Sequence, residues 1–167
     1  PCQEKHIAMI VDADPEMPPI MIDPGLIHQA LMNLLANAIE AVPSDTGVIT
    51  VRVSFNESRP DPNKPGSMLR PAVTINVIDN GPGVEQDKLA WIFEPFNTTK
   101  GLKGTGLGLA VTKRIVYEHK GRIRLESTPG KGASFKMIIP ADLDSMLDPS
   151  ATSNRAGHMM TDSLGIL

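Results

Sequence analysis

The sequence has little cysteine, no long apolar run and no signal-peptide pattern. A single cysteine, Cys2, cannot form an internal disulfide, so the fold does not depend on an oxidising compartment and we expect a cytoplasmic domain. No apolar run approaches the roughly 20 residues that a membrane-spanning helix needs. The chain begins at Pro1 without a methionine, so we expect a piece of a longer protein. Whether that longer protein carries a membrane anchor stays open.

The sequence also lacks an excess of positive charge. Its 16 lysines and arginines against 19 aspartates and glutamates give a net charge of -3, which argues against a protein held to nucleic acid by phosphate attraction. With 167 residues, of which 41% are hydrophobic, the chain has the composition of one globular domain with one core. We place that domain at residues 1–140. Periodicity is lost after residue 140, which predicts a flexible C-terminal tail over 141–167.

Hydrophobic periodicity predicts an alternation of strands and helices. A helix is expected to begin at Pro24, with Asp23 as its N-cap, because apolar residues then recur at helical spacing as far as Val42. The other expected elements, in chain order, are a strand at 6–11, a short extended piece at 20–22, a hairpin of strands 47–55 and 72–79 with a long polar loop, a helix over about 106–119, and a closing hairpin of 121–128 and 132–140. The fold class is therefore expected to be α+β, with the helices on one face of a sheet.

Two asparagines interrupt the apolar surface of the first predicted helix. Asn33 and Asn37 are four residues apart, so both amides lie on one helical face. A buried amide without a partner costs about 1 to 3 kcal/mol, so these side chains must be hydrogen-bonded or ligate something. They either cap a neighbouring loop or offer an amide oxygen to Mg²⁺, a hard cation that keeps waters and phosphates in its shell.

Asp79 ends a predicted strand in the segment DNGPG. Gly81 and Gly83 let the backbone turn and let a ligand approach without side-chain obstruction. A carboxylate held there can accept a hydrogen bond from the exocyclic amine of a base. A plain Asp-Asn-Gly turn explains the same residues without a ligand.

A second glycine cluster, GTGLGLA from Gly104 to Ala110, opens the second long helix. Backbone N–H groups at such a helix N-terminus form an anion site that suits phosphates. The dinucleotide-binding fingerprint does not fit, because its third glycine would fall at Leu109 and no apolar strand precedes the motif, and the P-loop lysine and hydroxyl are missing. The preceding EPFNTTKGLK carries Lys100 and Lys103, and predicts either a mobile segment that closes over a polyanion or a solvated basic loop.

These motifs, in this order, resemble those of the catalytic ATP-binding domain of bacterial sensor histidine kinases, in particular the nitrogen-regulation subgroup. The wider GHKL superfamily includes type II topoisomerase, mismatch-repair and heat-shock chaperone ATPases. NLLANAIEA is similar to the asparagine box, DNGPG to the first glycine box, IFEPFNTTK to the phenylalanine box, GTGLGLA to the second glycine box and STPGKGASF to the closing hairpin. The resemblance covers roughly residues 7–140 and implies the Bergerat ATP-binding fold, a two-layer α/β sandwich with a mixed sheet.

The resemblance also implies a site for ATP and Mg²⁺. Asn37 would ligate Mg²⁺ with Asn33 beside it, while Asp79 would bind the adenine amino group. Gly81 and Gly83 would make room for the base, and a lid would run over about 85–103. Lys100 and the backbone of Gly104, Gly106 and Gly108 would hold the phosphates. The other residues expected to contact the nucleotide are Thr98, Thr99, Thr105 and Leu107. The expected catalytic residues are Asn33, Asn37 and Lys100.

Asn33 separates the kinases from their hydrolysing relatives. Those relatives carry at this place a glutamate that activates water, and an amide cannot take that proton. The resemblance therefore implies slow hydrolysis and transfer of the γ-phosphoryl group to an outside nucleophile. Two alternatives stay open: an ATPase that uses nucleotide as a conformational switch, and a non-catalytic nucleotide-binding interaction module.

The phospho-acceptor is expected outside this chain. None of its four histidines has the surroundings of an acceptor: His6, His28, His119 and His158. The resemblance implies an upstream dimerisation and phospho-acceptor domain, a homodimeric full-length protein, and a response-regulator receiver domain as partner.

Some positions depart from the family pattern or leave two interpretations. Glu40 and Ala41 stand where a basic residue and an aromatic are common, so no phosphate contact is assigned there. Asn97 leaves the packing of the lid open, and Lys120 replaces a common glycine at an expected turn. Two aromatic residues are either core or a docking surface for the acceptor hairpin; we favour core for Phe93 and leave Trp91 open.

Overall fold

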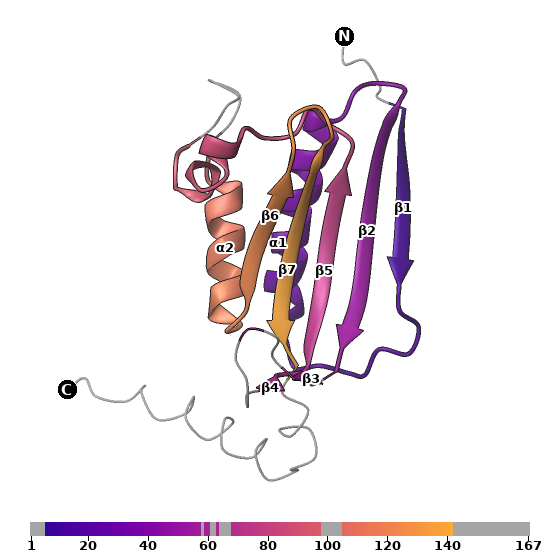
Figure 1. Ribbon diagram of the computed structural model, residues 1–167, viewed down its shortest axis with the longest axis vertical. Coiled ribbons are helices and arrows are strands. Elements are labelled where there is room, and N and C mark those ends of the chain that lie inside the picture. Colours follow the sequence, from indigo (N-terminus) through magenta and orange to yellow (C-terminus); the bar gives the residue numbers. More distant parts are fainter. Residues whose placement is uncertain (1–5, 58, 61–62, 64–67, 98–104, 142–167) are drawn as a thin grey trace, which may run out of the picture.

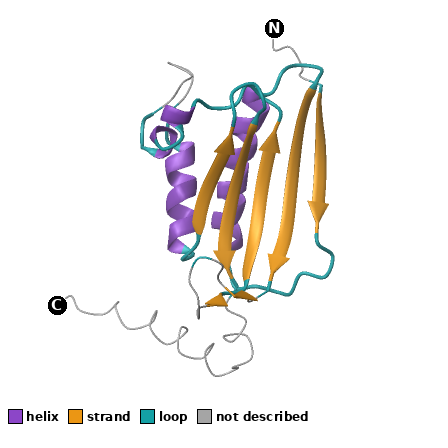
Figure 2. Cartoon of the chain, in the orientation of Figure 1, coloured by secondary structure: helices purple, strands orange, loops and turns teal. Residues whose placement is uncertain are grey.

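The computed structural model describes residues 6–57, 59–60, 63, 68–97 and 105–141 (Figure 1). Five strands form one mixed sheet in the order β1-β2-β5-β7-β6, with β1 parallel to β2 and the other neighbours antiparallel. These strands are β1 (Ile7–Ala13), β2 (Gly47–Asn56), β5 (Ala72–Asp79), β6 (Arg122–Ser127) and β7 (Ala133–Pro140). The helices α1 (Pro24–Ala41) and α2 (Gly108–Glu118) cover one face of the sheet (Figure 2). The predicted α+β, two-layer architecture is confirmed.

Helix α1 follows the sequence signals closely. The Asp23 carboxylate accepts a hydrogen bond from the Leu26 N–H at 3.0 Å, and Pro24 occupies the first turn, where its missing N–H costs nothing. The helix buries one stripe of apolar side chains against the sheet: Ile27, Ala30, Leu34 and Ala38. The predicted span of 24–42 is correct to within one residue.

Helix α2 begins two residues later than predicted. Gly106 has a φ of +66°, outside the right-handed helical region, so the helix starts only at Gly108. The helix ends in a turn that contains Lys120, whose φ of +56° is the left-handed conformation usually left to glycine. The expectation of a turn at this departure from the family pattern is therefore confirmed.

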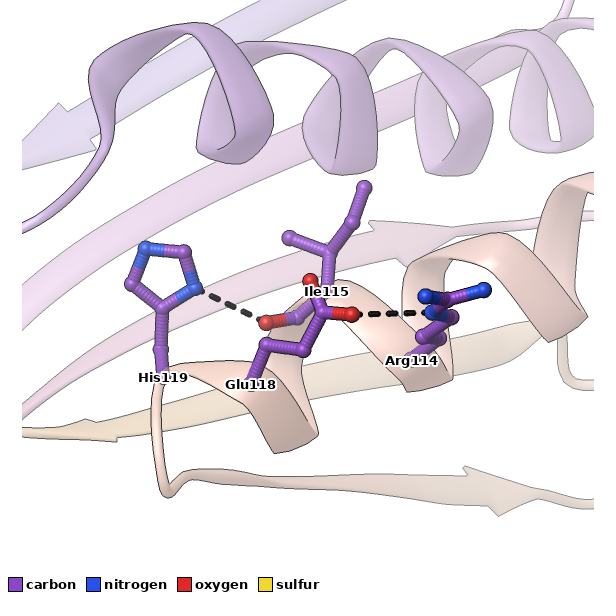
Figure 3. Close-up of polar contacts among 4 residues, drawn as sticks. All are labelled: Arg114, Ile115, Glu118 and His119. Atoms are coloured by element: carbon purple, nitrogen blue, oxygen red, sulfur yellow. Dashed lines mark hydrogen bonds and ion pairs between the residues drawn. The ribbon is translucent and has the colours of Figure 1, made fainter. Parts of the chain in front are cut away.

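A histidine joins the far ends of the two helices. The Nδ1 of His119 lies 2.8 Å from the Ile115 carbonyl oxygen (Figure 3). Its Nε2 lies 3.1 Å from the Asp23 backbone nitrogen. Since a carbonyl only accepts and an N–H only donates, the ring carries its proton on Nδ1 and accepts at Nε2. On the solvent side of the same turn, Arg114 and Glu118 form an ion pair at 2.8 Å (Figure 3). Both ring nitrogens of His119 therefore have structural partners.

The core lies between the helices and the sheet. Alternate residues of the two central strands point toward the helices, namely Val73, Ile75 and Val77 of β5, and Phe135, Met137 and Ile139 of β7. The opposite face of the sheet carries polar and charged side chains, as expected for a sheet covered on one side only.

Three features differ from the predictions. Residues 20–22 form no strand; Ile20 and Ile22 pack against the core from a coil that follows Pro18 and Pro19, which cannot donate to a sheet. Within the predicted loop after β2, two short strands pair, β3 (Arg59–Pro60) with β4 (Met68–Leu69). The expected lid contains two 3-10 helices, η1 (Gln86–Lys88) and η2 (Trp91–Phe93).

The predicted C-terminal tail, 141–167, lies outside the described residues except for Ala141. Within the part of the chain that the structure describes, no helix is long and apolar enough to span a membrane.

Candidate functional site

A cavity of about 830 Å³ brings together residues from all the sequence motifs. It lies between α1, the start of α2, the end of β5 and the segment that carries η2. Its volume is within the range of about 300 to 1,000 Å³ found for ligand sites. The predicted site residues that line it are Asn33, Asn37, Asp79, Gly83, Thr105, Gly106 and Gly108.

Asp79 places a buried carboxylate at one end of the cavity. The side chain is only 6% exposed, and one carboxylate oxygen accepts a hydrogen bond from the Gly81 N–H at 2.8 Å. Burial raises the pKa of Asp79, while hydrogen bonds from the backbone N–H groups of Gly81 and Ala133 act in the opposite direction. Among the described residues, Asp79 is the one acidic side chain that the fold buries. It is a fixed acceptor for a donor group of a ligand.

The glycines after Asp79 are required by close contacts. A Cβ on Gly81 would lie 2.8 Å from the Asp79 carboxylate and 3.1 Å from the Ala41 carbonyl oxygen, so this glycine makes room for the carboxylate itself. Gly81 does not line the cavity. Gly83 does, and its φ of +73° together with a collision between a Cβ and the Thr128 carbonyl oxygen excludes other residues.

Asn80 holds the end of β5 in place. Its side-chain N–H donates to the Thr46 carbonyl oxygen at 2.8 Å, and its side-chain oxygen accepts from the Val48 N–H at 2.8 Å. The backbone N–H of Asn80 also donates to the Val48 carbonyl oxygen at 3.2 Å. These bonds join the residue next to Asp79 to the loop that follows α1. These long-range bonds of Asn80 could not be predicted from the sequence, because an asparagine in a DNG turn gives no signal of a distant partner.

The closing hairpin between β6 and β7 supports the loop that follows β5. The Ser127 hydroxyl accepts from the Val84 N–H at 2.8 Å and donates to the Gly132 carbonyl oxygen at 2.7 Å. A Cβ on Gly132 would collide with the Asp79 carbonyl oxygen. Ser127 and Gly132 therefore shape the site without lining it. The motif STPGKGASF marked the hairpin in the sequence but not these contacts.

The two asparagines of α1 both line the cavity, as their spacing predicted. The Asn33 side-chain N–H donates to the Gly108 carbonyl oxygen at 3.1 Å and lies 3.4 Å from the Thr112 hydroxyl oxygen. The amide nitrogen of Asn33 thus joins α1 to the first turn of α2, so its partner lies in a helix and not in a neighbouring loop. The amide oxygen of Asn33 and the side chain of Asn37 belong to the cavity wall.

The start of α2 forms the other end of the cavity. Gly106 contacts the phenylalanine motif so closely that a Cβ would collide with the Phe96 backbone, and the Phe96 N–H donates to the Gly106 carbonyl oxygen at 3.0 Å. The first backbone N–H groups of a helix have no partner within the helix, which makes this end suitable for an anion. Leu107 is 38% exposed and does not line the cavity. Four residues predicted to contact the nucleotide lie outside the described residues: Thr98, Thr99, Lys100 and Gly104.

The aromatic residues of the phenylalanine motif have separate roles. Phe93 packs against the core with its ring edge toward Phe135, at a centroid distance of 6.3 Å and an angle of 75°, which confirms the core prediction. Trp91 is 39% exposed and lines the cavity. Asn97 donates from its side chain to the Trp91 carbonyl oxygen at 2.8 Å, so this departure from the family pattern caps the turn of η2.

The donor set of the cavity fits Mg²⁺ held together with phosphates. Within the described ranges, no cluster of three or more histidine, cysteine, aspartate or glutamate side chains is arranged to hold a metal ion. Mg²⁺ accepts amide oxygens and keeps several waters or phosphate oxygens in its shell. Asn37 lines the cavity and carries an amide oxygen of this kind.

Comparison with known proteins identifies relatives of this chain. Residues 22–143 match the family model described as histidine kinase-, DNA gyrase B- and HSP90-like ATPase. The sensory histidine kinase/phosphatase NtrB of Rhodobacter capsulatus is 38% identical over 139 residues, which are 81% of this chain and 37% of NtrB. The signal transduction histidine-protein kinase AtoS of Escherichia coli is 37% identical over 138 residues, 82% of this chain and 20% of AtoS. The chain thus spans less than half the length of these relatives.

Solved structures show the same fold. The catalytic domain of the histidine kinase ThkA matches with a TM-score of 0.65 and 32% identity, covering 81% of this chain and 80% of that domain. Full-length ShkA, solved in complex with AMPPNP, matches with a TM-score of 0.64 and 28% identity, covering 81% of this chain and 26% of ShkA.

Proposed function

The chain belongs to the family of histidine kinase-, DNA gyrase B- and HSP90-like ATPases and is homologous to the catalytic domains of sensor histidine kinases, and from this premise we propose that it binds Mg²⁺ and ATP and positions the γ-phosphoryl group for transfer to a histidine. The acceptor histidine would belong to a dimerisation domain outside this chain. The relatives NtrB and AtoS are both histidine kinases of greater length, which supports the placement of the acceptor histidine in a separate domain.

The proposal depends on the difference between the two ends of the cavity, one of which offers a hydrogen-bond acceptor and the other hydrogen-bond donors. At one end, the buried carboxylate of Asp79 is suited to accept from the exocyclic amine of adenine. At the other end, the start of α2 at Gly108 offers backbone N–H groups to an anionic group. Between these ends, Asn33 and Asn37 line the wall. A base at one end and a polyphosphate at the other is the arrangement that an adenine nucleotide requires.

The residues of the cavity favour phosphoryl transfer over hydrolysis. When bound to the phosphates and the Asn37 amide oxygen, Mg²⁺ would supply neutralisation of their negative charge. Asn33 cannot act as a general base for water, since an amide does not accept a proton and its nitrogen already donates to the Gly108 carbonyl oxygen. Asn33 instead orients the first turn of α2 against α1. We further propose Lys100, Thr98 and Thr99 as phosphate contacts from the lid.

The proposed partners follow from the same function. The catalytic domain requires its own dimerisation and phospho-acceptor domain, so the complete protein would act as a homodimer. It would pass the phosphoryl group to the receiver domain of a response regulator. We place the domain in the cytoplasm, where ATP is available.

Phosphoryl transfer in trans tests the proposal. The chain is mixed with a separately produced segment that carries the upstream hairpin of its own full-length protein, together with ATP labelled at the γ-phosphate. Acid-labile, base-stable label on the histidine of that segment is expected. Asn37→Ala is expected to abolish the label, whereas Gln29→Ala, an exposed change on the same helix, leaves it unchanged.

Two outcomes would overturn the proposed reaction. If the chain binds ATP but never labels a histidine, the non-catalytic interaction module becomes the better account. If the isolated chain releases phosphate steadily, and Asn37→Ala stops that release, the nucleotide-dependent switch ATPase is favoured instead.

A further inference from the structure

A second cavity lies at the end of the sheet opposite the nucleotide cavity. It measures about 410 Å³ and is formed where β5 and β6 begin, where β7 ends, and where the turn after α2 passes. In Figure 1 this is the end of the sheet nearest to β3 and β4, away from the arrowhead of β5 that carries Asp79. Because β5 has 8 residues, the two ends of the strand lie about 24 Å apart. The two cavities are therefore separate.

Three cationic residues line this cavity, and none of its lining residues in the described part of the chain is acidic. Lys120 lies in the turn between α2 and β6, Arg122 begins β6, and Arg70 comes from the residues just before β5, yet all three line one small space. Among the residues that the structure describes, neither Lys120 nor Arg122 forms an ion pair. The nearby acidic residues of the same elements pair elsewhere, Glu118 with Arg114 at 2.8 Å and Glu126 with Lys136 at 3.5 Å. The positive charge here is notable in a chain whose net charge is -3.

Lys120 is held in this place at a cost in stability. Its φ of +56° is left-handed, a conformation that is unfavourable for a residue with a Cβ but not for glycine. The turn itself is fixed, because the Lys120 N–H donates to the Tyr117 carbonyl oxygen at 2.8 Å and a Cβ on the next residue, Gly121, would collide with the Ile138 carbonyl oxygen. The turn that ends α2 therefore fixes the backbone from which the Lys120 side chain extends.

The floor of the cavity is apolar and rigid. Arg122 pairs with Ile138, and Ala72 pairs with Pro140, across the antiparallel strands. The Ala141 N–H donates to the Pro71 carbonyl oxygen at 2.8 Å, which fixes the chain where β7 ends. An apolar floor beneath cationic side chains excludes water on one side and strengthens the attraction between those cations and an anion.

We propose that this cavity binds a compact anion that carries two or more phosphate or carboxylate charges. Its volume is at the small end of the range for ligand sites, which favours a phosphorylated or polycarboxylic small molecule over a whole nucleotide. Arg122 presents a planar guanidinium group that binds oxyanions in pairs of hydrogen bonds, and Lys120 adds a point charge.

The test follows backbone amide resonances of the 167-residue chain by NMR during titration with pyrophosphate, citrate or inorganic phosphate at about 150 mM salt, where exposed charges are largely screened. The amides of Ala72, Gly121 and Arg122 are expected to shift with pyrophosphate or citrate and to shift less with inorganic phosphate. The amides of Gly83 and Gly108 report the nucleotide cavity separately. Titration with ATP tests whether the second cavity also binds a nucleotide. If only the amides of Gly83 and Gly108 shift, a nucleotide is excluded as the ligand of the second cavity.

Variants separate binding from folding. Lys120→Gly is expected to weaken the anion about three- to tenfold, the size of one lost charge contact, while it raises the melting temperature because the backbone strain is removed. Arg122→Gln is expected to weaken the anion similarly. Arg124→Gln, which removes an exposed charge from the same strand outside the cavity, should leave binding unchanged. No shift at the cavity amides, or equal weakening by Arg124→Gln, would overturn the proposal.

Discussion

Replacing Asp79 by asparagine keeps the shape of the side chain and changes a carboxylate into an amide at the closed end of the nucleotide cavity. In the wild type the carboxylate faces three donors: the backbone N–H groups of Gly81 and Ala133, and the proposed adenine amino group. An amide has only one oxygen, so its NH₂ group must face at least one of these donors. A hydrogen bond to a charged group contributes about 1.5 to 3 kcal/mol, so ATP affinity is expected to fall about 10- to 150-fold.

Asp79→Asn is expected to lower ATP affinity, but its free energy of unfolding, relative to that of the wild type, is expected to increase as the pH rises. Burial raises the pKa of Asp79 above its value in the unfolded chain. Its contribution to stability is therefore fully present below the unfolded pKa and is lost as the pH rises through the folded pKa. Asparagine does not titrate. The free energy of unfolding of Asp79→Asn, relative to that of the wild type, is expected to increase as the pH rises above about 4, the ordinary pKa of an aspartate.

Calorimetric titration with ATP at pH 7 and urea denaturation at several pH values measure both effects on the same preparations. Asn76→Ala serves as a control, because Asn76 lies on the same strand, bonds to Ser134 and does not line the cavity. An Asp79→Asn protein that binds ATP as tightly as the wild type would refute the assignment of the adenine end. A relative stability that falls with rising pH would refute the argument from burial.

Three further substitutions test the supports of the site. Lys120→Gly is expected to raise the free energy of unfolding by about 1 to 2 kcal/mol in urea denaturation, and no gain would show that the turn is not strained. Asn80→Ala is expected to lower stability by about 1 to 3 kcal/mol, since two backbone groups lose their partners, and to weaken ATP binding; an unchanged affinity would show that Asn80 does not position Asp79. Gly132→Ala is expected to lower the melting temperature more than Gly130→Ala, because both glycines have positive φ but only Gly132 contacts Asp79 closely; equal losses would contradict this.

Most of the fold could be predicted because its signals are local. Asp23, Pro24 and an apolar stripe define α1 within a few residues of one another, and the alternation in β5 and β7 is visible without knowledge of their partners. The start of α2 was misplaced because the sequence GTG does not reveal which glycine has positive φ. The extended piece at 20–22 was wrong because apolar residues in a coil can serve the core without a strand.

The site was predicted by residue type, and its supports were not. Asn33, Asn37 and Asp79 could be predicted because amide and carboxylate side chains can bind a ligand directly. The structure brings all three to one cavity. Asn80 and Ser127 act through backbone partners far away in the sequence, at positions 46, 48 and 84. Such partners depend on how β2, β5 and the β6–β7 hairpin meet, which periodicity does not encode.

We propose above that the nucleotide cavity, which Asn37 lines, binds ATP together with Mg²⁺. Calorimetric titration of the wild type and of Asn37→Ala with ATP, each with and without Mg²⁺, tests it most directly. The account predicts that Mg²⁺ strengthens ATP binding to the wild type and that Asn37→Ala loses this gain while it still binds ATP without the metal. Folded wild-type protein that binds no ATP, or a gain from Mg²⁺ that survives in Asn37→Ala, would contradict the account.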